Sequence, residues 1–221
     1  VHETAAEVST ATTTHGARPL SRLAGLGLNT PRLVAVHMTQ LNDEEIDHLA
    51  RDGVNVIHCP ESNLKLASGL CPLARLLAQD INVALGTDGA ASNNDLDMLS
   101  EMRTASLLAK GIAGDACAVP AATALSMATI NGARALGLDH SIGSLMPGKL
   151  ADVVAIDLSR FSARPLYDPL SQLVYSTQRD QVRHVWVGGR QVVNDGTLTT
   201  LDSEALATNA NSWAEKIQTH E

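Results

Sequence analysis

The sequence predicts an α/β fold for its first part and a β-rich fold for the remainder, and two patterns support this. Short, continuously apolar runs at residues 33–37, 54–58 and 83–88 alternate with helical segments as far as residue 137. Runs of this kind are typical of parallel strands covered on both faces, with helices as the crossover connections. Beyond Gly137, strand-like runs are separated by Pro-Gly and Gly-Gly turn signals.

Helices are predicted between and after the apolar runs. The clearest start is Asn42, because Glu45 three residues later completes a capping box, and the helix ends before Gly53. Gly137 ends another helix, since glycine readily adopts the left-handed conformation found there. The other helices of this part are expected at residues 4–14, 18–26, 72–79, 95–110 and 121–136, and residues 1–3 as the end of a strand.

The part after Gly137 is predicted to be mainly β. Residues 182–187 and 190–193 flank Gly188-Gly189, which is the pattern of a β-hairpin. Further strands are expected at residues 142–146 and 151–157, and a last helix at 203–217. The chain therefore divides into an α/β domain at 1–137, a β-rich domain at 138–200 and a C-terminal helix at 201–221.

Composition excludes several classes of function. The 221 residues carry a net charge of −8 and no long basic run, so we expect no binding to nucleic acid or to anionic membranes. Three cysteines at irregular spacing predict reduced thiols rather than a disulfide framework, which favours a cytoplasmic location. We find no apolar stretch of membrane-spanning length and no signal peptide.

Chemically active side chains stand at the predicted ends of four successive strands: His2-Glu3, His37, His58 and Asp88. Sites in parallel α/β folds form at the carboxyl ends of strands, so these groups are expected to converge. A single histidine at a strand end is usually structural, but four such groups in order favour a shared site. They suit hydrolysis at a metal: Asp88 as ligand and base, Glu3 as proton donor, and His37 holding the water.

Several segments resemble those of a known family. They are residues 1–4 (Val-His-Glu-Thr), 35–38, 58–69 (His-Cys-Pro-Glu-Ser-Asn-Leu-Lys-Leu-Ala-Ser-Gly), 86–95 (Gly-Thr-Asp-Gly-Ala-Ala-Ser-Asn-Asn-Asp) and 143–152. In this order they are similar to the aminohydrolase branch of the amidohydrolase superfamily, which includes triazine chlorohydrolases and guanine deaminases. The resemblance covers nearly the whole chain and is greatest to the methylthioadenosine/S-adenosylhomocysteine deaminases.

The resemblance implies a role for each matching position. Asp88 matches the metal-binding aspartate, and His37 matches the histidine that contacts the metal-bound water and is a second candidate ligand. Glu3 matches the glutamate that moves a proton and contacts the substrate. The implied catalytic residues are Glu3, His37 and Asp88, and the implied substrate-binding residues are Glu3, His37, His58, Ser62 and Asn63.

The implied reaction is hydrolytic deamination of an adenosine thioether, methylthioadenosine or S-adenosylhomocysteine, with release of ammonia. The implied metal is Zn²⁺, with Fe²⁺ as the alternative. The expected partner is a small purine nucleoside or related heterocycle, and the expected assembly is a homo-oligomer.

Departures from the family pattern keep two alternatives open. The family's His-x-His metal pair is absent, and its further histidine falls one residue before Val1. We therefore expect the C-terminal half of a metal-dependent-hydrolase (β/α)₈ TIM-like barrel with part of a small β-sandwich, inactive by itself. One alternative is deamination of another heterocycle, or triazine dechlorination. The other is a catalytically incomplete fragment or a module that pairs with another chain.

Overall fold

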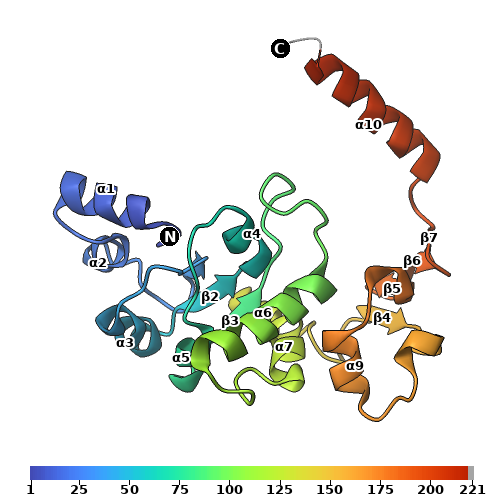
Figure 1. The fold of residues 1–221 in the computed structure, drawn as a ribbon, viewed down its shortest axis with the longest axis horizontal. Coiled ribbons are helices and arrows are strands. Elements are labelled where there is room, and N and C mark those ends of the chain that lie inside the picture. The colour runs from blue at the N-terminus through green and yellow to red at the C-terminus, as the bar shows by residue number, and fades with distance from the viewer. Residues whose placement is uncertain (219–221) are drawn as a thin grey trace. The chain divides into compact units, whose positions relative to one another are not determined.

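Three parallel strands form the central sheet of the first part of the chain, in a computed structural model that describes residues 1–218 (Figure 1). The strands are β1 (Val34–Val36), β2 (Asn55–His58) and β3 (Val83–Leu85), and they lie side by side in the order β1-β2-β3. Their parallel pairing confirms the α/β prediction, and the pairing of Val36 with Ile57 and of His58 with Leu85 aligns their carboxyl ends.

The chain start extends this sheet by a short stretch of backbone pairing. Val1 donates its amino group to the Val36 carbonyl at 3.2 Å, and its own carbonyl accepts from the Met38 N–H at 3.4 Å. Two backbone hydrogen bonds from one residue to both sides of the facing residue are the pattern of parallel strand pairing. Residues 1–2 therefore lie beside β1, as the sequence predicted for a strand end.

Helices surround this sheet, and all of them except α4 and α9 were expected. The first unit contains α1 (Ala5–His15), α2 (Pro19–Gly25), α3 (Asp43–Asp52), α4 (Pro60–Lys65), α5 (Leu73–Ala78), α6 (Met98–Ala113), α7 (Ala121–Met127), α8 (Ile130–Ala135) and α9 (Pro169–Tyr175). Both unexpected helices are six or seven residues long and have proline in their first turn, which presets the helical φ angle.

Two predicted helices have different limits in the structure. The α6 helix begins at Met98, because the Asp97 carboxylate caps it by accepting from the Leu99 N–H at 2.9 Å. It continues through Gly111 and ends at Gly114, whose φ of 62° is left-handed. The single helix predicted for 121–136 is two helices, because Thr129 leaves the helical conformation at φ −132° and ψ −96°.

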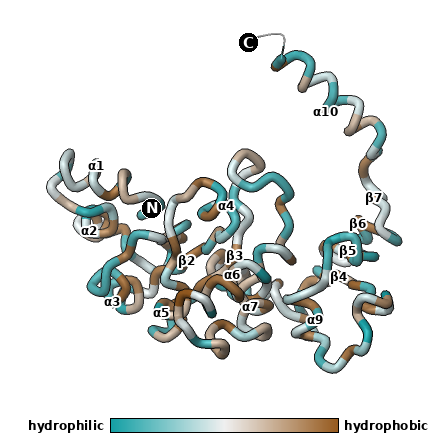
Figure 2. The backbone as a smooth tube through the Cα atoms, in the orientation of Figure 1, coloured by the Kyte–Doolittle hydropathy of each residue, from teal (hydrophilic) through white to brown (hydrophobic). Residues whose placement is uncertain are grey.

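The core of this unit is aliphatic, as the 2% aromatic content requires. Figure 2 shows hydrophobic residues concentrated around α5 and α6. Both the helices and the strands contribute side chains that are 0% exposed. Examples are Leu49 of α3, Val56 of β2, Leu76 of α5 and Val83 of β3. Burial on both sides of the strands explains why their sequences are continuously apolar.

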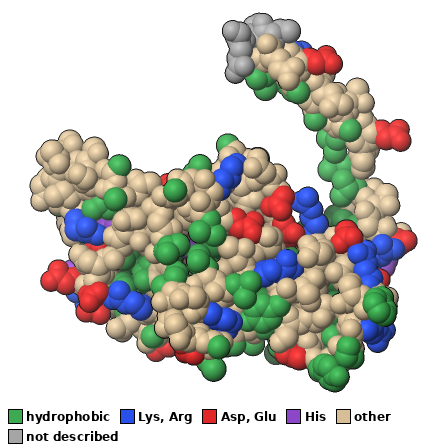
Figure 3. Space-filling model, in the orientation of Figure 1, with side chains coloured by type: hydrophobic (Ala, Val, Ile, Leu, Met, Phe, Trp, Pro, Cys, Tyr) green, Lys and Arg blue, Asp and Glu red, His purple; other side chains and the backbone are tan. Residues whose placement is uncertain are grey.

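The second unit is built on an antiparallel sheet. Its strands β4 (Val153–Ile156), β5 (Val182–Val187), β6 (Arg190–Asn194) and β7 (Thr197–Leu198) are neighbours in that order. Gly188 and Gly189 have φ angles of 56° and 81°, the double positive φ of a two-residue hairpin turn, so the predicted hairpin is confirmed. The helix α10 (Ser203–Gln218) has no buried residue, and Figure 3 shows hydrophobic side chains along it.

One predicted strand, residues 142–146, is wrong. This stretch forms turns, with a hydrogen bond from the Met146 N–H to the Ser144 carbonyl at 3.1 Å. Gly143 has a φ of 85° and packs so closely that a Cβ there would lie 2.7 Å from the Ala133 Cβ. Close packing of the backbone on α8, and not strand pairing, therefore shapes this connection.

The structure has two compact units, and their boundaries differ from the domain boundaries predicted from the sequence. The first unit comprises Val1–Lys149 with Pro165–Thr177, and the second comprises Leu150–Arg164 with Gln178–Glu221. Residues 219–221 of the predicted C-terminal segment 201–221 lie outside the described residues. None of the helices in the described range combines the length and apolar character needed to cross a membrane.

Replacing Leu49 by alanine tests the importance of the aliphatic core. Leu49 is 0% exposed, so Leu49→Ala leaves a cavity and is expected to lower the free energy of unfolding by about 2–5 kcal/mol. The matched control is Leu107→Ala on α6, where the side chain is 52% exposed and a change within about 0.5 kcal/mol is expected. Denaturant unfolding measures both. Equal losses for the two variants would contradict this assignment of the core.

Candidate functional site

Side chains at the carboxyl ends of the strands make the candidate site, and the backbone there is unusual. His37 directly follows β1 and has a φ of 79°, and Asp88 lies three residues beyond β3 with a φ of 63°. Positive φ is uncommon for residues other than glycine, and such strain gathers at functional sites. Both residues therefore turn sharply out of the sheet, at the edge where chemistry was predicted.

Glu3, His37 and Asn63 form a connected chain of side chains. The Glu3 Oε2 atom lies 3.6 Å from His37 Nε2, and His37 Nδ1 lies 3.0 Å from Asn63 Nδ2. The three residues come from the chain start, the end of β1 and the α4 helix. The side chains of Glu3 and His37 are 29% and 13% exposed, so the imidazole is partly enclosed and the carboxylate remains accessible.

The contact between Asn63 and His37 predicts which ring nitrogen carries a proton. As placed, the Asn63 amide nitrogen faces His37 Nδ1 and can only donate, which favours a neutral ring with its proton on Nε2, whereas Asn63 Oδ1 has no hydrogen-bond partner among the described residues. An Nε2–H group points a donor toward the Glu3 carboxylate and toward any molecule bound between them. The pair is thus suited to hold a water or a developing negative charge.

Glu3 is held by its neighbours at both its side chain and its backbone. Ser68 donates its hydroxyl to Glu3 Oε1 at 3.0 Å, the Glu3 N–H donates to Glu7 Oε2 at 2.7 Å, and Thr39 donates its hydroxyl to the Glu3 carbonyl at 2.6 Å. Neither Ser68 nor Thr39 was singled out from the sequence, although Ser68 belongs to the 58–69 motif. These contacts hold Glu3 in one position, and a fixed position is what proton transfer by a carboxyl group would need.

Asp88 is bound by two serines. Ser62 and Ser92 donate their hydroxyls to the same oxygen, Oδ2, at 2.8 and 2.6 Å. The hydrogen bonds from Ser92 and Ser62 hold the pKa of Asp88 below its usual value, so the carboxylate is ionised at neutral pH. Ser62 was predicted as a site residue, whereas Ser92 was missed within the 86–95 motif. Because both serines bind Oδ2, the Oδ1 atom of Asp88 can bind another partner.

His58 is, like Ser62 and Asn63, one of the enclosed residues among those predicted for the site. It ends β2, is 2% exposed, and its Nδ1 has no hydrogen-bond partner among the described residues. Burial, with a smaller contribution from the charge of His37, lowers the pKa of His58 to about 4, so the ring is neutral at physiological pH. A neutral buried imidazole fits a role in shaping the pocket better than one in carrying charge.

Other reactive groups of the sequence lie elsewhere or are inert. His2 is 0% exposed and accepts from the Leu20 N–H at Nε2, so it faces away from Glu3, as expected for adjacent residues. Burial raises the pKa values of Cys59 and Cys71 to about 12, which excludes a thiolate nucleophile. His15, His48, His140 and His184 lie outside the cluster, and His220 lies outside the described residues.

The donor set matches part of a zinc site. Zinc takes three or four nitrogen, oxygen or sulfur ligands at about 2.0–2.3 Å. Asp88 offers the oxygen that the serines leave. His37 offers Nε2 to a metal only in the tautomer that leaves this nitrogen unprotonated. Within residues 1–218, however, no three histidine, cysteine, aspartate or glutamate side chains lie close enough to hold a metal ion together. These residues supply some ligands of such a site and not a complete set.

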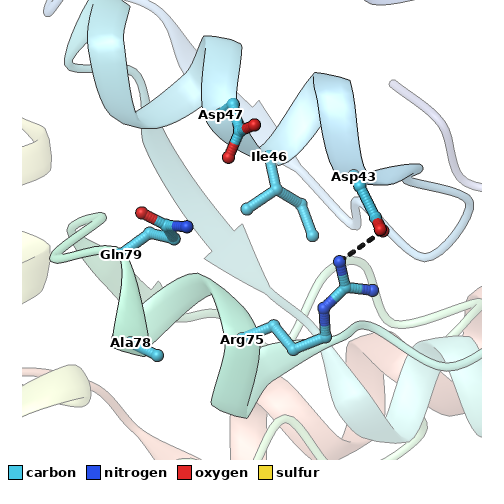
Figure 4. Close-up of a pocket in the computed structure, with 6 residues that line it drawn as sticks. All are labelled: Asp43, Ile46, Asp47, Arg75, Ala78 and Gln79. Atoms are coloured by element: carbon cyan, nitrogen blue, oxygen red, sulfur yellow. Dashed lines mark hydrogen bonds and ion pairs between the residues drawn. The ribbon is translucent and has the colours of Figure 1, made fainter.

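A groove lies between helices α3 and α5. Figure 4 shows Asp43, Ile46 and Asp47 of α3 facing Arg75, Ala78 and Gln79 around a groove of ≈ 370 Å³. Its polar contact is an ion pair of 2.5 Å between Arg75 Nη2 and Asp43 Oδ1. The groove contains no histidine or convergent donor set among the residues that line it, so the chemistry belongs to the strand ends.

Comparison with known proteins agrees with this geometry. A profile of the amidohydrolase family matches residues 1–192. The chain belongs to the amidohydrolase family. One relative of this amidohydrolase is the 5-methylthioadenosine/S-adenosylhomocysteine deaminase of Teredinibacter turnerae, 54% identical over 98% of this chain and 49% of the relative. Another is the 5'-deoxyadenosine deaminase of Methanothermobacter thermautotrophicus, 48% identical over 98% and 50%.

Solved structures show the same fold. An adenosine deaminase from Xanthomonas campestris, crystallised with bound zinc, has a TM-score of 0.97 and 53% identity, covering 99% of this amidohydrolase and 50% of that chain. The zinc complex of atrazine chlorohydrolase from Arthrobacter aurescens has a TM-score of 0.89 and 26% identity, covering 94% and 46%. The α/β fold thus matches that of TIM-barrel hydrolases, and the chain spans about half the length of its relatives.

Replacing Asn63 by aspartate is expected to change the tautomer of His37. A carboxylate can only accept, so in Asn63→Asp the Nδ1 atom of His37 must carry a proton. The ¹⁵N chemical shifts of the His37 ring distinguish the two states. Asn94→Asp, at an exposed position of the 88–97 loop, serves as the control and should leave the His37 signals unchanged. If the His37 ring in the Asn63→Asp variant still carried a proton only on Nε2, Asn63 would not be the group that determines the His37 tautomer.

Proposed function

We propose that these residues form part of the active site of a metal-dependent hydrolase that deaminates an adenosine thioether, methylthioadenosine or S-adenosylhomocysteine, and releases ammonia. The observation that carries the proposal is the placement of Glu3, His37 and Asp88 at one edge of the parallel sheet. The relatives named above are deaminases of methylthioadenosine, S-adenosylhomocysteine and 5'-deoxyadenosine, which supports the same substrate class.

Each residue has a role that its geometry allows. Asp88, ionised at neutral pH, accepts a proton from the attacking water, and the Nε2–H of His37 orients that water. Glu3 donates a proton to a ring nitrogen of the purine while the hydroxide of the water bonds to the amino-bearing carbon. The proton held by Asp88 then passes to the amino group, the C–N bond breaks to release ammonia, and Glu3 regains a proton from the new hydroxyl as the carbonyl forms. Ser62 and Asn63 keep Asp88 and His37 in position, and His58 closes the pocket as a neutral ring.

Zinc is the metal we propose for this site, with Asp88 as a ligand. His37, the second candidate, would be a ligand only with Nε2 unprotonated, so the tautomer favoured by its contact with Asn63 assigns it to the water instead. When bound, a divalent metal lowers the pKa of water to about 7 and so provides a nucleophile at neutral pH. Because the described residues lack a complete ligand set, the remaining ligands come from another segment of the protein or from another chain. The zinc in two similar structures supports this choice.

We propose further that the first part of the chain is the C-terminal half of a (β/α)₈ barrel. In this proposal residues 1–137 are barrel and residues 138–200 belong to a small β-sandwich, followed by a helix at 201–221. Three parallel strands with an additional pair at Val1 amount to about half of an eight-stranded barrel, which supports the proposal. A half barrel exposes strand edges, so a homo-oligomer or a further segment covers them.

Triazine dechlorination is a weaker candidate than deamination. The atrazine chlorohydrolase is 26% identical to this chain, whereas the deaminases named above are 48–54% identical. Because fold alone does not determine function, the higher identity to the deaminases is what supports deamination as the proposed reaction.

Replacing Asp88 by asparagine tests the proposed reaction. An amide cannot accept the proton of water, so ammonia release from methylthioadenosine is expected to fall by roughly 100-fold or more in the active protein that contains this chain. Asp47→Asn, in the groove between α3 and α5, is the control and should retain activity. Unchanged ammonia release in Asp88→Asn would refute the assignment.

Zinc content tests whether the ligand set is complete. After exposure to zinc and desalting, the purified 221-residue chain is expected to keep much less than one zinc ion, because a stable site needs three or four protein ligands. Elemental analysis measures the metal. A stoichiometric amount of tightly held zinc would show that these residues complete the site without help.

A further inference from the structure

A buried carboxyl group lies beneath the site and takes no part in the mechanism described above. Glu101, in the first turn of α6, is 0% exposed. Its Oε1 accepts from Asn93 Nδ2 at 2.5 Å, and its Oε2 accepts from the Glu61 backbone N–H at 3.3 Å. Burial raises the pKa of Glu101 to about 8, and the nearby Glu61 carboxylate contributes. Burying a carboxyl group costs folding free energy, so a structural or functional role is expected for Glu101.

The two partners of Glu101 are the chain neighbours of the two serines that bind Asp88. Glu61 precedes Ser62, and Asn93 follows Ser92. Both serines donate to Asp88 Oδ2. One carboxyl group thus joins the start of α4 to the 88–97 loop, the two segments that together hold Asp88.

Further hydrogen bonds make this connection rigid. Asn93 Oδ1 accepts from the N–H groups of Asp95 and Leu96 at 3.2 and 3.0 Å, which fixes its amide so that Nδ2 faces Glu101. The Glu61 carboxylate accepts from the hydroxyls of Ser100 and Thr104 on α6. The α6 helix therefore binds both segments along its first two turns.

We propose that Glu101 is a positioning residue for the deaminase reaction, which joins the Ser62 and Ser92 segments so that both hydroxyls meet Asp88. This inference rests on the proposed function for its effect on catalysis, while its structural part stands on the hydrogen bonds alone. The group acts through Glu61 and Asn93 and touches neither the substrate nor Asp88.

The test exchanges the donor and the acceptor of the Asn93–Glu101 hydrogen bond. Glu101→Gln keeps the shape, but an amide nitrogen cannot accept, whereas both oxygens of a carboxyl group can accept whether or not it carries a proton. The amide nitrogen must face one of the two donors, so one hydrogen bond is lost. Adding Asn93→Asp restores an acceptor opposite that amide nitrogen and keeps acceptors for the Asp95 and Leu96 N–H groups. If the double variant recovers what Glu101→Gln loses, the effect is due to the hydrogen bond between positions 93 and 101 and not to which residue stands at either position.

Two readouts are needed. In the active protein, Glu101→Gln is expected to lower kcat by on the order of 100-fold with little change in KM, as for a group displaced by about 1 Å, and the double variant to recover most of it. In the full chain, amide hydrogen exchange at residues 61–63 and 92–96 is expected to be roughly tenfold faster in Glu101→Gln and to return in the double variant.

Ser106→Ala is the matched control. Ser106 lies on the same helix and is 0% exposed, and its hydroxyl donates to the Val119 carbonyl at 2.6 Å and lies 2.9 Å from the Tyr175 hydroxyl. The substitution therefore removes buried hydrogen bonds without touching either segment. It should leave kcat and the exchange of residues 61–63 and 92–96 unchanged, even if it lowers the melting temperature.

Normal kcat in Glu101→Gln, or a double variant that recovers melting temperature but not kcat, would overturn the proposal. Unchanged amide exchange at both segments would overturn it as well. The proposed function fails if the protein that contains this chain, with a complete metal site and no substitution, releases no ammonia. The exchange measurement still decides whether Glu101 joins the two segments.

Discussion

The parallel register of three short strands is the constraint on which the rest of this structure depends. Because the strands pair side by side in chain order, the residues that leave their carboxyl ends meet at one edge. His37, His58 and Asp88 are distant from one another in sequence and come together for this reason alone. The enclosed aliphatic side chains on both faces hold that register, since a slip of one residue would turn every side chain around.

A layer of polar contacts converts this shared edge into a site. Asn63 contacts Nδ1 of His37, two serines hold Asp88, and Ser68 holds Glu3. Most of these partners come from one stretch, residues 58–69, which folds as the short α4 helix with its following turn. The side chains proposed as catalytic come from strand ends, while the groups that orient them come mainly from the connections.

Stability and chemistry oppose each other in this region. Positive φ angles at His37 and Asp88, a neutral buried His58 and a buried Glu101 all cost folding free energy. The surrounding apolar core compensates for these costs. Among residues 1–218 this edge of the sheet also lacks a complete set of metal ligands.

The sequence by itself determined the α/β class, the three strands, the capping box at Asn42 and the hairpin at Gly188-Gly189, because these follow from local periodicity and turn chemistry. It also placed Glu3, His37 and Asp88 at strand ends, although their roles came from the family resemblance. Only the tertiary structure decided that Ser92 binds Asp88, that Glu101 joins two segments, and that residues 142–146 turn instead of forming a strand. Those features arise from contacts between residues distant in sequence or from close backbone packing, and neither leaves a local pattern to read.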